Sequence, residues 1–204
     1  MAMNAIAQQQ IEETPDAMSM DDFIQAYGDA PFELINGEKI IMPAQISRSG
    51  ITAGNLYFHL RSYLNTQKQS LGMTFIETPF VITYEQSSWV RDSRTPDVMF
   101  YSAAKMQAVQ EDPDWQAKPM VGAADFVAEV ISPTDTHIKV NEKCLRYLED
   151  GVSLLWIIVP DTKTVTVYTA EPPNNPAIYT KPDDTLPGNL ILPDFSLSLA
   201  ILFT

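Results

Sequence analysis

The stretch that decides the fold is Phe126-Val127-Ala128-Glu129-Val130-Ile131, which is apolar except for Glu129 and predicts a buried strand. A carboxylate inside such a strand loses its hydration, which costs several kcal/mol unless another group compensates the charge. A second acid, Asp97, follows Pro96 and opens another apolar run at residues 98–101. Because divalent cations prefer hard oxygen ligands, two acids at strand positions predict a metal site.

A helix is predicted directly after this strand. Residues 132–135 combine turn and helix-start signals, and Gly151 is a suitable stop for a helix that begins near His137. A strand rises about 3.3 Å and a helix about 1.5 Å per residue, so the returning helix brings Lys143 back to the level of Glu129. The spacing therefore predicts that these two side chains lie close together.

The predicted helix has two different faces. An apolar stripe at helical spacing predicts the buried face and makes Cys144 a core residue. A basic stripe either faces the carboxylates or is an ordinary solvated helix surface. The apolar stripe consists of Val140, Cys144, Tyr147 and Leu148, and the basic stripe of Lys139, Lys143 and Arg146.

Upstream, the strongest local signal is a β-hairpin. Residues 32–35 and 39–42 are strand-like, and Asn36-Gly37 between them supplies the positive φ angles of a type I′ turn. The other elements are predicted from periodicity and from breakers. They are helices over residues 19–27 (stopped by Gly28) and 51–67, strands over 73–84, 154–159 and 164–169, a polar loop over 87–95 and a surface excursion over 102–122.

The composition is that of one folded domain. With 204 residues and a hydrophobic fraction of 45%, we expect a mobile arm at residues 1–17 and a single domain at residues 18–204. No apolar stretch approaches the roughly 20 residues of a membrane span, so no membrane partner is expected. The single cysteine cannot form an internal disulfide, which favours a cytoplasmic protein.

The net charge of −13 argues against indiscriminate binding to nucleic acid. The charge is uneven, since residues 1–38 carry eight acids and no base, whereas residues 39–105 carry more bases than acids. These bases form either a modest binding surface or a set of ordinary solvated charges. They are Lys39, Arg48, Arg61, Lys68, Arg91, Arg94 and Lys105.

Taken in order, several motifs between residues 32 and 203 resemble the Uma-type restriction endonuclease family of the PD-(D/E)XK nuclease superfamily. The Pro-Asp pair alone is a weak signal, whereas the ordered series is specific. The motifs are Phe32-Glu33-Leu34-Ile35-Asn36-Gly37-Glu38, Pro96-Asp97, Glu129-Val130-Ile131-Ser132-Pro133, Glu142-Lys143 with Tyr147, Gly151-Val152 with Trp156, and Leu192-Pro193-Asp194-Phe195.

The resemblance implies an α/β fold: a restriction-endonuclease-like core built on a mixed sheet, with flanking helices and an N-terminal β-hairpin. Asp97 and Glu129 would occupy adjacent positions of this sheet and bind Mg²⁺, with Mn²⁺ as a substitute. The backbone carbonyl of Val130 is a further expected ligand. Glu33 either completes the metal shell or is an ordinary hairpin acid.

The resemblance also bears on the catalytic lysine. Superfamily nucleases usually carry it two residues after the second acid, where this chain has Ile131. In the family this lysine lies instead on the following helix. The rise per residue of strand and helix places it at Lys143 in this chain. This chain also departs from its relatives at Arg48, Lys139 and Val159, which affects substrate contacts more than the acidic pair.

The leading prediction is a Mg²⁺-dependent DNA endonuclease that uses a metal-activated water, with Lys143 stabilising the transition state. DNA binding is expected to be weak and salt-dependent, and a homodimer is expected by analogy because double-strand cutting needs two sites. Two alternatives stay open. One is a catalytically degenerate nuclease fold that acts as a binding module. The other is a glycosidase-like use of two carboxylates, which would need an aromatic sugar groove that the sequence does not clearly supply.

Overall fold

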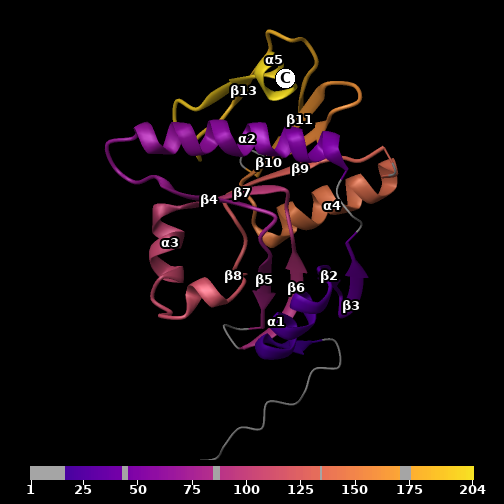
Figure 1. The fold of residues 1–204 in the computed structure, drawn as a ribbon, viewed down its shortest axis with the longest axis vertical. Coiled ribbons are helices and arrows are strands. Elements are labelled where there is room, and N and C mark those ends of the chain that lie inside the picture. The colour runs from indigo at the N-terminus through magenta and orange to yellow at the C-terminus, as the bar shows by residue number, and fades with distance from the viewer. Residues whose placement is uncertain (1–16, 43–45, 85–87, 134, 171–175) are drawn as a thin grey trace, which may run out of the picture.

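A six-stranded mixed sheet lies at the centre of the protein in the computed structural model (Figure 1). The structure describes residues 17–42, 46–84, 88–133, 135–170 and 176–204, so nearly all of the expected arm at residues 1–17 lies outside it. Helices flank the sheet, which confirms the predicted mixed α/β architecture. In spatial order the strands are β12 (Ala177–Tyr179), β11 (Thr164–Thr169), β10 (Leu154–Val159), β9 (Phe126–Val130), β7 (Val98–Ser102) and β4 (Gly72–Ile76).

Strand β9 is paired on both edges, parallel to β10 and antiparallel to β7. All of its residues are buried, as its apolar run predicts. Because side chains alternate along a strand, Phe126 and Ala128 pack into the core beneath helix α2 (Ser47–Thr66). Val127 and Glu129 lie on the opposite face, where helix α4 (His137–Asp150) covers the sheet. The core therefore has two layers, one on each side of β9.

Helix α4 has the predicted bounds and ends at the predicted glycine, and its N-cap is Thr136, the residue after the predicted helix-start signal at 132–135. The side chain of Thr136 accepts a hydrogen bond from the backbone N–H of Lys139, and Gly151 ends the helix with φ of 101°. Cys144 and Tyr147 are buried against the sheet, as expected for the apolar stripe. The strand–turn–helix unit that carries Glu129 and Lys143 was thus predictable from local sequence.

Helix α2 begins four residues earlier than predicted. Residues 47–50 lie outside the predicted helix, but they form its first turn. Ser49 and Thr52 are buried there, and the Thr52 hydroxyl donates to the carbonyl of Arg48 at 3.1 Å. Burial and this internal hydrogen bond outweigh the low helix propensity of serine and glycine.

The N-terminal hairpin is formed by β2 (Phe32–Ile35) and β3 (Glu38–Ile41). Asn36 and Gly37 have φ of 50° and 78°, the positive values that the type I′ prediction requires. The preceding helix α1 (Met20–Asp29) begins near the predicted start, with Ser19 as its N-cap, but it runs through Gly28. It ends at Ala30 because a residue before proline is driven to extended backbone.

The predicted loop at residues 87–95 is wrong, because residues 89–94 form strand β6 (Trp89–Arg94). This strand pairs with β5 (Phe80–Thr83) and belongs to a second sheet of order β1-β6-β5-β8. Figure 1 shows β6 beside the hairpin. The side chains of Asp92, Ser93 and Arg94 are buried because they bind the backbone of the hairpin. Ser93 Oγ accepts from Leu34 N at 2.7 Å, Asp92 Oδ1 accepts from Asn36 N at 3.0 Å, and Arg94 Nη1 donates to the Leu34 carbonyl at 3.1 Å.

The predicted excursion at residues 102–122 is also more ordered than expected. It contains helix α3 (Ala103–Val109), a short 3-10 helix (Trp115–Ala117) and strand β8 (Met120–Val121), which runs parallel to β5. Met106 and Met120 anchor this segment in the core on the α4 side of the sheet. Two buried methionines are too sparse a periodic signal to reveal these elements from sequence.

The remaining elements are short. Strand β1 (Met18–Ser19) pairs with β6, and β13 (Thr185–Pro187) pairs with β14 (Ser196–Ser198). Helix α5 (Leu199–Leu202) packs against α2. Within the described part of the chain, no helix is both long and apolar enough to cross a membrane.

We expect Ser93→Ala to lower the free energy of unfolding by about 1–3 kcal/mol, because the buried N–H of Leu34 loses its acceptor. Chemical denaturation of wild type and variant measures the effect. Ser70→Ala, at an exposed position, is the matched control and should change stability by less than about 0.5 kcal/mol. Equal stability of the Ser93→Ala variant and wild type would show that β6 does not anchor the hairpin.

Candidate active site

Glu129 is the centre of a buried polar cluster. It lies on β9 opposite Ile157 of β10 and is only 5% exposed. Its Oε2 accepts a hydrogen bond from Lys143 Nζ at 2.9 Å, and its Oε1 accepts one from the hydroxyl of Tyr147. Both oxygens of the buried carboxylate are therefore satisfied by side chains of α4.

The contact between Lys143 and Glu129 confirms that these residues lie at the same level. The basic stripe as a whole does not face the carboxylates, however. Lys139 is exposed, and Arg146 pairs with Glu142 at 3.2 Å on the helix surface. Of the three predicted basic residues, only Lys143 turns toward the acids, because α4 presents a single position per turn to this part of the sheet.

Glu33 enters the cluster from the hairpin. Its Oε1 accepts from the backbone N–H of Thr95 at 3.1 Å and lies 3.6 Å from Lys143 Nζ. The side chain is 10% exposed. Glu33 is therefore not a solvated hairpin acid, since it bridges the segment before Asp97 to the lysine on α4.

Asp97 lies directly before β7, the neighbour of β9 in the sheet. Its Oδ2 accepts from the backbone N–H of Val130 at 2.6 Å, which joins the ends of the two strands. Asp97 and Glu129 thus occupy neighbouring strands, as the resemblance implied. The metal-binding role of the Val130 carbonyl stays a prediction.

Burial raises the pKa of Glu129 to about 8. The charge of Lys143 acts to lower this pKa, whereas repulsion from Asp97 and Glu33 raises it further. Burial acts to lower the pKa of Lys143, but the carboxylates of Glu129 and Glu33 outweigh it and the net shift is upward. Desolvation and the adjacent Glu129 also raise the pKa of Tyr147. At neutral pH Glu129 therefore retains a proton that a free glutamic acid side chain would release.

The donor chemistry of this cluster fits a hard divalent cation. Glu33, Asp97 and Glu129 supply carboxylate oxygens, and only one lysine balances their charge. In the arrangement described, however, no three His, Cys, Asp or Glu side chains among the described residues are grouped to hold a metal ion. In this arrangement Lys143 and Tyr147 take up both oxygens of Glu129.

Two features of the cluster were missed by sequence reasoning. Tyr147 was placed on the apolar stripe and in the family motif without a role at the site, but its hydroxyl binds Glu129. Its position four residues after Lys143, on the same helix face, was the available signal. Arg94 was assigned to a possible basic surface, but it is buried 3.1 Å from Asp150 at the end of α4. This ion pair fixes the helix against β6.

The basic residues 39–105 do not form a continuous binding surface. Four of the seven are paired with acids, which leaves little uncompensated positive charge along this segment. The pairs are Arg48 with Asp161, Arg91 with Asp92, Arg94 with Asp150 and Lys105 with Asp125.

A mixed sheet with two acids on neighbouring strands, and a lysine returned to them by the next helix, is the arrangement of a restriction-endonuclease-like fold. The chain belongs to the Uma2 family, described as "Putative restriction endonuclease", whose model matches residues 20–200. This membership supports a nuclease function in general. The sequence-based resemblance is confirmed.

The fold is also similar to a solved structure from Anabaena variabilis, described as "a putative nuclease belonging to DUF820". The two share 21% sequence identity with a TM-score of 0.71, and the match covers 91% of this chain and 97% of the other. At this identity the likeness establishes the fold. A comparison with curated protein sequences finds no significant match.

The raised pKa of Glu129 predicts how the stability of the metal-free protein depends on pH. Between about pH 4.5 and pH 8 the folded protein holds a proton that the unfolded chain releases, so stability falls as pH rises. We expect the free energy of unfolding of wild type to fall by about 2–5 kcal/mol across this interval. Glu129→Gln, which mimics the protonated side chain, should show a much smaller fall.

Urea unfolding with EDTA at pH 5 and pH 8 measures this difference. Glu142→Gln is the matched control, because Glu142 lies on the exposed face of α4 and should leave the pH dependence unchanged. An equal pH dependence in wild type and Glu129→Gln would show that Glu129 is ionised in the folded protein.

Proposed function

We propose that this protein is a Mg²⁺-dependent endonuclease that hydrolyses phosphodiester bonds in DNA. The observation that carries the proposal is the convergence of three carboxylates from separate segments on one lysine, with Glu33 and Glu129 in contact with Lys143 and Asp97 joined to β9. A purely structural cluster would not need three acids around one cation, because the surplus negative charge destabilises the fold.

Asp97, Glu129 and Glu33 would hold the cation, with the Val130 carbonyl as a further ligand. When bound, Mg²⁺ supplies Lewis-acid polarisation of the phosphate and lowers the pKa of a water molecule. For Glu129 to contribute an oxygen, the ammonium group of Lys143 must leave Oε2. Loss of the Glu129 proton and release of Lys143 would therefore accompany metal binding.

Lys143 would then be free to interact with the substrate. Its raised pKa keeps the ammonium group charged, and its stem places that group beside the three carboxylates. It would donate to an oxygen of the scissile phosphate and stabilise the negative charge that grows in the transition state. Tyr147 would hold the Glu129 carboxylate in place, because its hydroxyl binds Oε1 from the buried side.

Several finer features remain part of this proposal. DNA affinity would be weak and salt-dependent, since the chain carries a net charge of −13. We also propose that residues 18–204 form one domain. The protein would form a homodimer, which supplies two cutting sites, and would be located in the cytoplasm. The alternative is a catalytically degenerate fold that only binds, which the close contact between Lys143 and Glu129 would favour if it persisted with metal present.

We expect Asp97→Asn to abolish cleavage of plasmid or single-stranded DNA in Mg²⁺ or Mn²⁺, with a loss of more than about 100-fold. The substitution replaces the carboxylate by a neutral amide. This weakens the binding of the divalent cation more than it disturbs the fold. Isothermal titration with Mn²⁺ should show the matching loss of metal binding. Asp112→Asn, at an exposed position, is the control and should cleave as wild type.

An inactive wild type that still binds DNA would favour the degenerate binding module. A large fall in the melting temperature of Asp97→Asn in metal-free buffer would instead identify Asp97 as a structural residue.

Lys143→Met should lose about 100- to 1000-fold in cleavage rate while it retains its fold and metal binding, because it keeps the aliphatic stem and removes the charge. Lys139→Met, one turn earlier and exposed, is the matched variant and should have a much smaller effect. Single-turnover cleavage at saturating metal compares the two. A larger loss at Lys139 than at Lys143 would contradict the assigned role of Lys143.

A further inference from the structure

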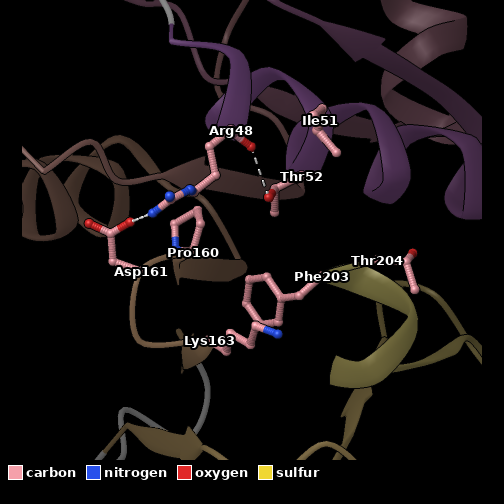
Figure 2. A pocket seen from close by; sticks show the side chains of 8 residues that line it. All are labelled: Arg48, Ile51, Thr52, Pro160, Asp161, Lys163, Phe203 and Thr204. Atoms are coloured by element: carbon pink, nitrogen blue, oxygen red, sulfur yellow. Dashed lines mark hydrogen bonds and ion pairs between the residues drawn. The ribbon is translucent and has the colours of Figure 1, made fainter.

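A pocket of about 520 Å³ opens beside the first turn of α2, away from the acidic cluster. Figure 2 shows it between α2, the turn that follows β10 and the segment that follows α5. Its volume lies within the range of small-molecule sites. Its lining includes Arg48, Pro160, Asp161, Lys163, Phe203 and Thr204.

The pocket combines an aromatic wall with cationic groups. Phe203 is half-buried against the core, and Figure 2 shows its ring turned into the pocket beside Lys163. Lys163 is exposed and has no ion-pair partner among the residues that the structure describes. Two cations therefore face one carboxylate here, in a chain with a net charge of −13. The side chains that line the pocket therefore carry more positive than negative charge, on an acidic protein.

Arg48 is available to an anion although it pairs with Asp161. The side chains of the two residues are 63% and 41% exposed, and an ion pair in that setting contributes at most about 1 kcal/mol. An incoming phosphate group could therefore share or replace the Asp161 carboxylate as the partner of the guanidinium. Such an exchange keeps a negative group beside Arg48 throughout.

The position of the pocket relates it to the acidic cluster. Strands β9 and β10 are parallel, Glu129 is opposite Ile157, and Pro160 follows three residues later. At about 3.3 Å per residue, the pocket wall lies about 10 Å further along the same direction. The pocket lies on the α2 face of the sheet and the cluster on the α4 face, so a nucleic-acid strand that reaches both would pass around the carboxyl-terminal ends of β9 and β10.

We propose that this pocket binds one nucleotide of the strand on which the candidate active site acts, with the base against Phe203 and a phosphate at Lys163 and Arg48. The inference rests on the proposed nuclease function. Stacking on an aromatic ring beside basic side chains holds single strands with little sequence preference. The pocket would let an acidic protein bind a polyanion at a specific site, although its overall charge repels polyanions.

The test is binding of a short fluorescein-labelled single-stranded DNA in EDTA, so that no cleavage occurs. Phe203→Leu keeps an apolar side chain and removes the ring, and should weaken binding about fivefold or more. Lys163→Asn removes the charge and suits the positive φ of 52° at this position. It should weaken binding and reduce the slope of log affinity against log salt by about 0.7.

The matched control is Lys68→Asn, which makes the same charge change beyond the far end of α2, about 30 Å away along the helix. It should bind as wild type. If Lys163→Asn loses no more affinity than Lys68→Asn and Phe203→Leu binds as wild type, the proposal is overturned. Unfolding curves of each variant identify any loss that comes from misfolding, and Lys163→Asn, at the surface, keeps the test valid if Phe203→Leu is unstable.

A competition experiment distinguishes binding of a nucleotide within a DNA strand from binding of a free nucleotide. If the pocket holds part of the strand, excess dAMP should displace the labelled DNA from wild type and have little effect on Lys163→Asn. If dAMP binds at Phe203 without displacing DNA, the pocket serves free nucleotides and the proposal fails. Absence of Mg²⁺-dependent cleavage, with the predicted losses in binding intact, would reject the proposed catalytic function and leave this binding site standing.

Discussion

The hydrogen bond from Lys143 to Glu129 is the contact on which the candidate site depends. A carboxylate inside β9 is costly without a partner, and a lysine turned toward the sheet from α4 is costly for the same reason. Each group makes the position of the other tolerable, and Tyr147 satisfies the remaining oxygen. The apolar layers on both faces of β9 offset the desolvation free energy that remains. The polar cluster is therefore held by the fold and does not itself stabilise the fold.

The hairpin completes this cluster, and β6 determines where the hairpin lies. Ser93 and Asp92 bind its backbone N–H groups, while Arg94 binds the Leu34 carbonyl and also lies against Asp150 at the end of α4. Through these contacts β6 holds both the strand that carries Glu33 and the helix that carries Lys143 in position. A hairpin alone would be marginally stable in water, so Glu33 could not be positioned without β6.

Under the proposed function, the distribution of charge would give the protein two different surfaces for a nucleic acid. At the acidic cluster the negative groups exceed the positive ones, which suits a divalent cation and repels a phosphate in its absence. At the pocket beside α2, the aromatic ring of Phe203 and two cations offer the opposite character. An acidic nuclease that held its substrate mainly at such a pocket would bind weakly overall and would depend strongly on metal at the cleavage site.

The sequence by itself determined the local units. The Asn36-Gly37 turn, the buried run around Glu129, the caps of α4 and the return of Lys143 to the level of Glu129 all follow from contacts between residues close in the chain. Only the tertiary structure decided that residues 89–94 form a strand, because its polar side chains are stabilised by a hairpin some 60 positions away. It likewise decided that Glu33 reaches Lys143, that Tyr147 binds Glu129 and that Arg94 is buried. Local periodicity contains no information on such partners, since a buried polar group is tolerated only where a distant segment supplies its hydrogen bonds.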